Sequence, residues 1–234
     1  MTPSARSGGK HALLSEWRRS LQRERALIAL FDLGRQKTYG LRAARWYAFG
    51  VFVTYAIAIA MAKGAEQARV IHGFVRAALV ALSWVVGALA TLGAAQALAQ
   101  QAERDSLAAL AVQRGHSPGA LLRARTLAAA QRIARLVGLP ALLLVVVGLV
   151  RGAALPWACA VAPGVLVYAG VLGLTLAVLA QFAAELAPTH PRALLLALVL
   201  GPLLMSQVFP GIPSFPQLFS WLLARLLDAG ACLT

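Results

Sequence analysis

The side chains that could carry catalysis or bind a metal are few in this 234-residue chain, and they lie far apart. Ser83 and Ser206 lack the G-x-S-x-G setting of a nucleophile elbow. No D-x-x-D or D-x-x-x-D carboxylate pair occurs to hold magnesium and a diphosphate, and no H-E-x-x-H motif occurs. The isolated histidines fall in predicted loops or tails: His11, His72, His116 and His190. The sequence therefore predicts no catalytic, cofactor-binding or metal-binding residues, and a membrane enzyme of unfamiliar motif is kept only as an alternative.

The chain also lacks the Walker lysine motif, so it cannot hydrolyse ATP by a P-loop of its own. A pump driven by an ion gradient usually carries a carboxylate or histidine within a span. Neither occurs in the five stretches that contain no charged residue, which are 46–62, 77–102, 136–150, 152–184 and 193–224. Any active transport is therefore expected to draw on a partner subunit.

The composition is that of a membrane protein. Hydrophobic residues make up 60% of the chain and charged residues 13%, against roughly 45–50% and 25% in an average soluble domain. A spanning helix needs about 20 mostly apolar residues, and the charge-free stretches supply several. The net charge of +14 is attributed to Lys and Arg flanking the spans, not to nucleic-acid binding. Cys159 and Cys232 have no C-x-x-C spacing, which indicates neither a disulfide framework nor a metal site.

Residues 1–45 are predicted to form a cytoplasmic tail with an amphipathic basic helix. Apolar residues recur at helical spacing between arginines, at Leu14, Trp17, Leu21, Ile28 and Phe31. Such a helix beside a span is expected to lie along the membrane interface, with its arginines near anionic head groups. The lipid bilayer is thus the first predicted partner.

Residues 46–234 are predicted to form one all-α transmembrane domain. Its spans are expected at about 46–62, 74–99, 136–150, 157–182 and 193–209. Pro210, Pro213 and Pro216 then exclude a continuous helix. Residues 214–231 carry one apolar stripe but also Arg225 and Asp228, which favours a re-entrant or interfacial helix over a sixth full span. Five spans are the first choice and six a close second.

The orientation follows from the positive-inside rule. Most of the 22 Lys and Arg residues fall in segments 1–45, 99–135 and 183–192. These segments share one side of the membrane if the N-terminus is cytoplasmic. The abundance of Arg, Ala and Leu fits a GC-rich bacterial genome, so a bacterial inner membrane is expected.

The segment from Gln100 to Arg135 is predicted to form two helices joined by a tight cytoplasmic turn. Gly115 suits a helix end that needs positive φ. Ser117 followed by Pro118 is typical of an N-cap with proline at the first helical position. The helix that follows is expected to run toward the membrane, and the element could dock in a groove on another protein. A solvated loop that merely connects two spans is the alternative.

In this order of elements the chain resembles the membrane-spanning subunit of type-2 ABC transporters. That family has an amphipathic cytoplasmic helix, two spans, a cytoplasmic helix-turn-helix beginning E-R-(E/D)-x-(S/T)-L with a later Ser near Pro, and further spans. The residues of this chain at matching places are Glu103, Arg104, Asp105, Ser106, Leu107, Leu110, Ser117, Pro118, Leu121 and Arg125. Arg125 stands where a Lys is common, the usual Gly after the acidic pair is missing, and a clear uncharged sixth span is absent.

The resemblance implies an ATP-driven exporter in which these residues couple the chain to the ATPase. It implies a P-loop ATPase partner that holds ATP and Mg, and a second membrane subunit, identical or homologous. It also implies short re-entrant helices, which the region 210–229 resembles. A non-transporting membrane scaffold or assembly protein is the alternative function.

A few polar residues lie deep within the predicted spans. They could line a passage between two subunits, but such residues more often form hydrogen bonds with neighbouring helices. They are Thr54, Tyr55, Thr91, Gln96, Tyr168, Thr175, Ser206 and Gln207.

Overall fold

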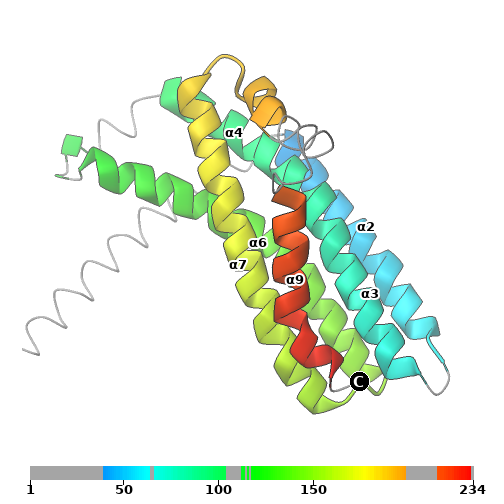
Figure 1. The fold of residues 1–234 in the computed structure, drawn as a ribbon. Helices are drawn as coiled ribbons and strands as arrows, with labels where there is room; N and C mark the ends of the chain where they lie inside the picture. The colour runs from blue at the N-terminus through cyan, green and yellow to red at the C-terminus, as the bar shows by residue number, and fades with distance from the viewer. Residues whose placement is uncertain are drawn as a thin grey trace, which may run out of the picture.

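The computed structural model describes residues 39–63, 66–103, 112–113, 115, 117–198 and 215–232, and every regular element within them is helical. Figure 1 shows long helices standing side by side as a bundle. In chain order they are α2 (Tyr39–Met61), α3 (Gln67–Ala81), the π-helical turn η1 (Leu82–Val86), α4 (Gly87–Glu103), α6 (Pro118–Val150), α7 (Leu155–Leu186), a helix over 191–198, and α9 (Phe215–Ala231).

Four of these helical segments are long and apolar enough to cross a membrane. They are Tyr39–Met61, Gln67–Gln100, Pro118–Val150 and Leu155–Leu186. The second joins α3, η1 and α4 into one rod, because no residue between Gln67 and Gln100 leaves the helical path. The prediction of an all-helical chain with several membrane-spanning helices is therefore confirmed for these four.

The helices extend beyond the charge-free stretches used to predict the spans. α2 begins at Tyr39 and not at residue 46, and α6 begins at Pro118 and not at residue 136. Charged residues end a hydrophobic run but not a helix, since Arg and Lys are good helix formers and Arg42, Arg45 and Arg123 are exposed. The predicted spans thus mark the apolar parts of longer helices.

The bundle is held together by close contacts between α6 and α7, with α4 on α7 and α2 against both α4 and α6. At the α6–α7 crossing, a Cβ on Gly173 would lie 2.6 Å from the carbonyl oxygen of Ala130. Where α2 meets α4, a Cβ on Gly93 would lie 2.7 Å from the backbone nitrogen of Leu41. Only glycine allows backbones to approach this closely.

The two ends of the bundle differ. At the lower end in Figure 1 are the turns that join α2 to α3 and α6 to α7, together with the C-terminus of α9. Arg151 ties these turns together, since its guanidinium donates to the carbonyl oxygen of Ala62 at 3.3 Å and its own carbonyl accepts from Gln67 Nε2 at 2.8 Å. The upper end holds the start of α2 and the ends of α4 and α7.

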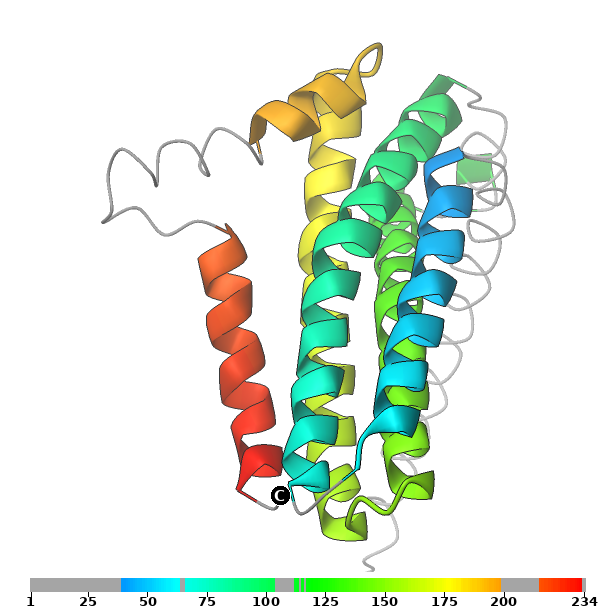
Figure 2. The same ribbon diagram turned by 90° about the vertical axis from the view of Figure 1, so that its right-hand side faces the viewer.

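α9 lies along the bundle and not across it. Figures 1 and 2 both show it beside α7, with its direction close to the bundle axis. Leu223 and Leu227 are buried in this contact, and a Cβ on Gly164 of α7 would lie 2.6 Å from the carbonyl oxygen of Leu226. Of the predicted span 193–209, residues up to 198 lie in the helix 191–198, and 199–209 lie outside the described residues.

Candidate functional site

The turn before α6 has the predicted local structure. Gly115 has φ of +79° and donates its N–H to the carbonyl oxygen of Val112 at 2.9 Å. Ser117 is the N-cap of α6, where its Oγ accepts from the N–H of Ala120 at 3.2 Å, and Pro118 takes the first helical position. The expected positive-φ glycine, N-cap and proline are confirmed.

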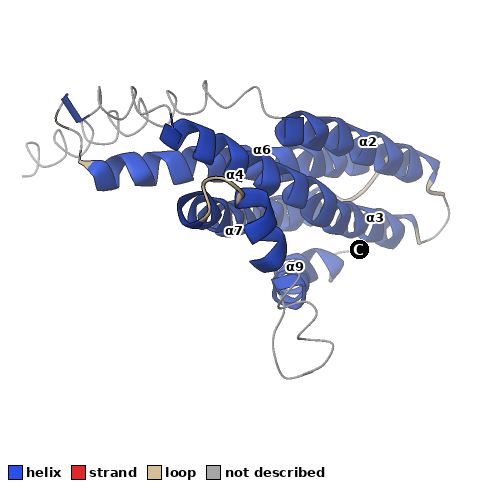
Figure 3. Cartoon of the chain, turned by 90° about the horizontal axis from the view of Figure 1, so that it is seen from above, coloured by secondary structure: helices blue, strands red, loops and turns tan. Residues whose placement is uncertain are grey.

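The first turns of α6 project sideways from the upper part of the bundle, as Figures 1 and 3 show. This segment, Pro118–Ala129, is called the arm below. Its Leu121 is buried, whereas Arg123 is exposed and Leu122 and Leu127 are 41% and 39% exposed. Arg125 is half-buried. The arm therefore presents a mixed apolar and basic face to its surroundings.

The structure describes only part of the remaining predicted coupling element. Glu103 is the last residue of α4. Outside the described residues lie Arg104, Asp105, Ser106, Leu107 and Leu110. The same holds for the predicted interfacial helix with Leu14, Trp17, Leu21, Ile28 and Phe31.

The threonines proposed as pathway lining bond to their own helices. Thr54, Thr91 and Thr175 donate to the carbonyl oxygens of Gly50, Gly87 and Val171 at 2.9, 2.7 and 2.9 Å. In each case the acceptor lies four residues earlier, a common arrangement for hydroxyls in helices. These three hydroxyl protons are therefore not available to a ligand.

Other polar residues in this group join different helices. Tyr168 Oη and Ser83 Oγ lie 2.9 Å apart and connect α7 with η1. Gln96 of α4 accepts a hydrogen bond from Arg192. The ring of Tyr55 packs edge-on against Phe74, with centroids 6.4 Å apart. Ser206 and Gln207 lie outside the described residues.

The expectation that all four histidines lie in loops or tails is wrong for His72. It lies in α3, is 8% exposed, and its Nδ1 accepts from Trp157 Nε1 at 3.1 Å. The helix begins at Gln67, several residues before the predicted span, and so carries His72 into the bundle. His190 lies exposed in the turn after α7 as expected, whereas His11 and His116 lie outside the described residues.

Two of the proposed lining residues, Thr91 and Tyr168, border a cavity of about 160 Å³ on one side of the bundle. The cavity lies between the α3–η1–α4 rod, α7, the helix 191–198 and α9. Ser83 also borders this cavity. The sequence around Ser83 excluded a nucleophile elbow and suggested no other role for it. Sequence reasoning missed this residue because its partner Tyr168 is 85 positions away.

Within the described ranges, no group of three or more His, Cys, Asp and Glu side chains is placed to hold a metal ion. Cys159 and Cys232 are exposed free thiols. The chain was compared with protein-family models, with curated proteins and with solved structures. None matches.

Proposed function

We propose that the chain is the membrane-spanning permease subunit of a type-2 ABC exporter. In this proposal it lies in a bacterial inner membrane with its N-terminus in the cytoplasm and pairs with a second membrane subunit, identical or homologous. Separate P-loop ATPase subunits bind ATP and Mg and supply the energy. The cargo is a molecule that these two membrane subunits move across the bilayer.

The arm is the observation that carries the proposal. It begins at a sharp turn with a positive-φ glycine and a capped helix start, and it projects beside the bundle. A helix of this kind can fit a groove on a partner through its apolar residues Leu122 and Leu127 and through Arg123. Because α6 continues from the arm into the bundle without a break, a push on the arm would reach the spans.

The C-terminal part belongs to the same proposal. The direction of α9 along the bundle supports a re-entrant helix or a sixth span over a helix lying in the interface. In this proposal the predicted amphipathic helix of the segment 1–45 packs beside the arm. Export is the direction implied by the family resemblance.

The test is purification of the tagged protein from its native cells in mild detergent, with identification of the co-purifying chains and an ATPase assay. We expect a stoichiometric P-loop ATPase. Glu103→Ala and Asp105→Ala should insert normally but uncouple ATP hydrolysis from transport. Glu66→Ala is the control, since Glu66 is 74% exposed just before α3, outside the coupling element.

Two outcomes would reject the proposal. A chain that purifies alone, without ATPase activity, would favour a membrane scaffold or assembly protein. Substrate turnover by the purified single chain would favour a membrane enzyme. Normal coupling in both acidic variants would remove Glu103 and Asp105 from the mechanism.

A further inference from the structure

The cavity beside α9 has walls that are almost entirely apolar. Side chains such as Val80, Leu172 and Leu176 line it, and three aromatic residues border it: Trp84, Tyr168 and Phe219. The rings of Tyr168 and Phe219 meet edge to face, with centroids 6.3 Å apart. Its volume of about 160 Å³ is close to that of engineered apolar cavities that hold a benzene-sized molecule.

Besides the indole N–H of Trp84, the polar side-chain groups at this cavity are hydroxyls, and each hydroxyl has already used its proton. Ser83 Oγ donates to the carbonyl oxygen of Leu79 at 2.6 Å. Since a hydroxyl carries one hydrogen, Tyr168 must be the donor in its 2.9 Å contact with Ser83. Thr91 donates to Gly87, and Ser220 donates to the carbonyl oxygen of Gln217 at 2.9 Å.

The described hydroxyls at the cavity can therefore only accept a further hydrogen bond. Tyr168 Oη keeps free lone pairs, because its hydrogen-bond partner Ser83 takes only its proton. Tyr168 is also 2% exposed, so water competes little for these lone pairs. A matching occupant has one hydrogen-bond donor on an otherwise apolar body.

We propose that this cavity binds a small aromatic alcohol, with its ring among Trp84, Tyr168 and Phe219 and its O–H donating to Tyr168 Oη. Aromatic edges favour an aromatic guest over an alkyl chain. The donor requirement separates a phenol from an arene of the same shape. The site goes beyond the exporter proposal and does not depend on it, because the cavity lies within one chain.

The same chemistry could come from two sources, a membrane-dissolved phenolic compound such as a quinol or a phenolic molecule taken from the aqueous phase. The probe is 4-fluorophenol, compared with 4-fluorotoluene, which replaces the hydroxyl by a methyl group. Binding is followed by fluorine NMR line broadening in phosphatidylcholine nanodiscs. Empty nanodiscs provide the baseline for partition into lipid.

We expect wild-type protein to bind 4-fluorophenol about three- to tenfold more tightly than 4-fluorotoluene, as one net hydrogen bond allows. Tyr168→Phe should keep binding of the arene and lose the preference for the phenol. Leu176→Trp should fill the cavity and abolish binding of both. Leu174→Trp is the matched control, because Leu174 is exposed on α7 and does not border the cavity.

Equal affinity for the two probes, or a phenol preference that persists in Tyr168→Phe, would overturn the proposal. So would binding that survives Leu176→Trp in a variant that elutes as folded protein. If Tyr168→Phe does not fold, Ser83→Ala gives a second reading: Tyr168 then loses its acceptor, and its proton becomes available to the ligand. An acceptor-only probe, 4-fluoroanisole, should then bind more tightly than it does to wild type, and unchanged binding of this probe would overturn the proposal.

A competition arm identifies the source. Native membrane lipid extract is added to nanodiscs that contain the bound probe. Displacement supports binding of a membrane-dissolved phenol, and retention of the probe supports binding of one from the aqueous phase. Both results require the site to exist, since both begin from measured probe binding.

Discussion

Gly170 and Gly173 lie one turn apart on α7 in different surroundings. A Cβ added at Gly173 would lie 2.6 Å from the carbonyl oxygen of Ala130 and 3.0 Å from the backbone nitrogen of Ala134. A Cβ added at Gly170 would meet nothing within 4 Å. Comparing alanine variants of these two glycines therefore separates the effect of close helix packing on stability from the effect of helix propensity.

Gly173→Ala should destabilise the protein by roughly 1–3 kcal/mol, because α6 and α7 must move apart. Gly170→Ala should be neutral or slightly stabilising, since alanine favours the helix over glycine. The measurement is the fraction of protein that stays monodisperse in detergent after heating, followed by fluorescence-detected gel filtration. Equal thermal stability of the two variants would mean that α6 and α7 do not pack as closely at Gly173 as the structure shows.

The hydrogen bond between Trp157 and His72 holds the lower end of α7 to α3. Trp157→Phe should cost about 1 kcal/mol more in wild type than in a His72→Leu background, because only the wild type loses a hydrogen bond. The four proteins of this cycle are compared by thermal unfolding in the same detergent. Identical costs in both backgrounds would show that the bond contributes nothing.

The structural role of a residue was predictable from the sequence where that role depends on its immediate neighbours in the chain. Gly115, Ser117 and Pro118 have their predicted roles because a positive φ, a cap and a first-turn proline depend on immediate neighbours. His72 was wrongly placed in a loop, and the role of Ser83 was not recognised. Both errors arise because the partners of these residues, Trp157 and Tyr168, come from a helix distant in the sequence. A single sequence holds no signal for which helices become neighbours.

At the scale of elements, the arm depends on its turn. Gly115 has a left-handed backbone, whereas Gly119 lies in the first turn of α6, and an added Cβ meets nothing within 4 Å at either position. Any effect of Gly115→Ala must therefore come from the backbone and not from a clash.

Gly115→Ala should strain the turn by about 1–2 kcal/mol. Gly119→Ala should strengthen the start of the arm, because alanine has the higher helix propensity. Amide hydrogen exchange of the peptide that contains residues 112–121 should become faster in the first variant and slower in the second. Coupled ATPase activity, if the partner is present, should fall only in the first. Equal exchange in both variants would contradict the role given to the turn.

The helical class was predictable, and four of the five predicted spans coincide with long apolar helices of the described residues, but the helix ends were not predictable. Apolar runs marked the cores of the four long helices. The start of α6 at Pro118 was foreseen as a separate cytoplasmic helix, but its fusion with the span at 136–150 was not. Residues 126–135 are mostly Ala, Leu, Gln and Arg, which are good helix formers, so nothing in the composition ends the helix there. The π-helical turn η1 also left no pattern that sequence reasoning could use.

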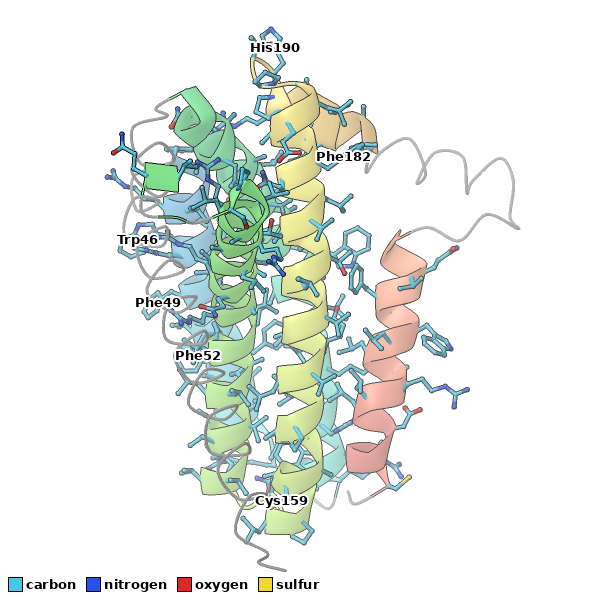
Figure 4. All side chains as sticks on the ribbon, turned by 90° about the vertical axis from the view of Figure 1, so that its left-hand side faces the viewer. Trp46, Phe49, Phe52, Cys159, Phe182 and His190 are labelled. Atoms are coloured by element: carbon cyan, nitrogen blue, oxygen red, sulfur yellow. The ribbon has the colours of Figure 1, made fainter. Side chains whose placement is uncertain are left out.

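At the scale of the whole molecule, the chain has positions suitable for thiol labelling at both ends of the bundle. Figure 4 labels His190 and Cys159 at opposite ends. Cys232, an exposed thiol just after α9, lies at the same end as the α6–α7 turn. These positions permit a direct test of orientation.

In a Cys159→Ser background, a membrane-impermeant maleimide should label Cys232 in cells with a permeable outer membrane and an intact inner membrane. A His190→Cys variant that lacks both natural cysteines should be labelled only after the inner membrane is permeabilised. This pattern follows from a cytoplasmic upper end, as the positive-inside rule predicts. The reverse pattern would invert the topology and move the arm away from a cytoplasmic ATPase.

The continuity of α6 has a mechanical consequence. Its 33 residues span about 50 Å at 1.5 Å per residue, and at Ala130 its backbone passes so close to Gly173 that a Cβ there would lie 2.6 Å from the carbonyl oxygen. About 18 Å of helix lie on the arm side of this contact and about 30 Å on the other. If α6 turns as one body about this contact, a shift of the arm tip is enlarged roughly 1.7-fold at Val150. Pro140 lies on the longer side, where the missing backbone N–H makes the helix easiest to bend. In the proposed exporter, a small movement of the ATPase against the arm would become a larger movement at the opposite end of the bundle.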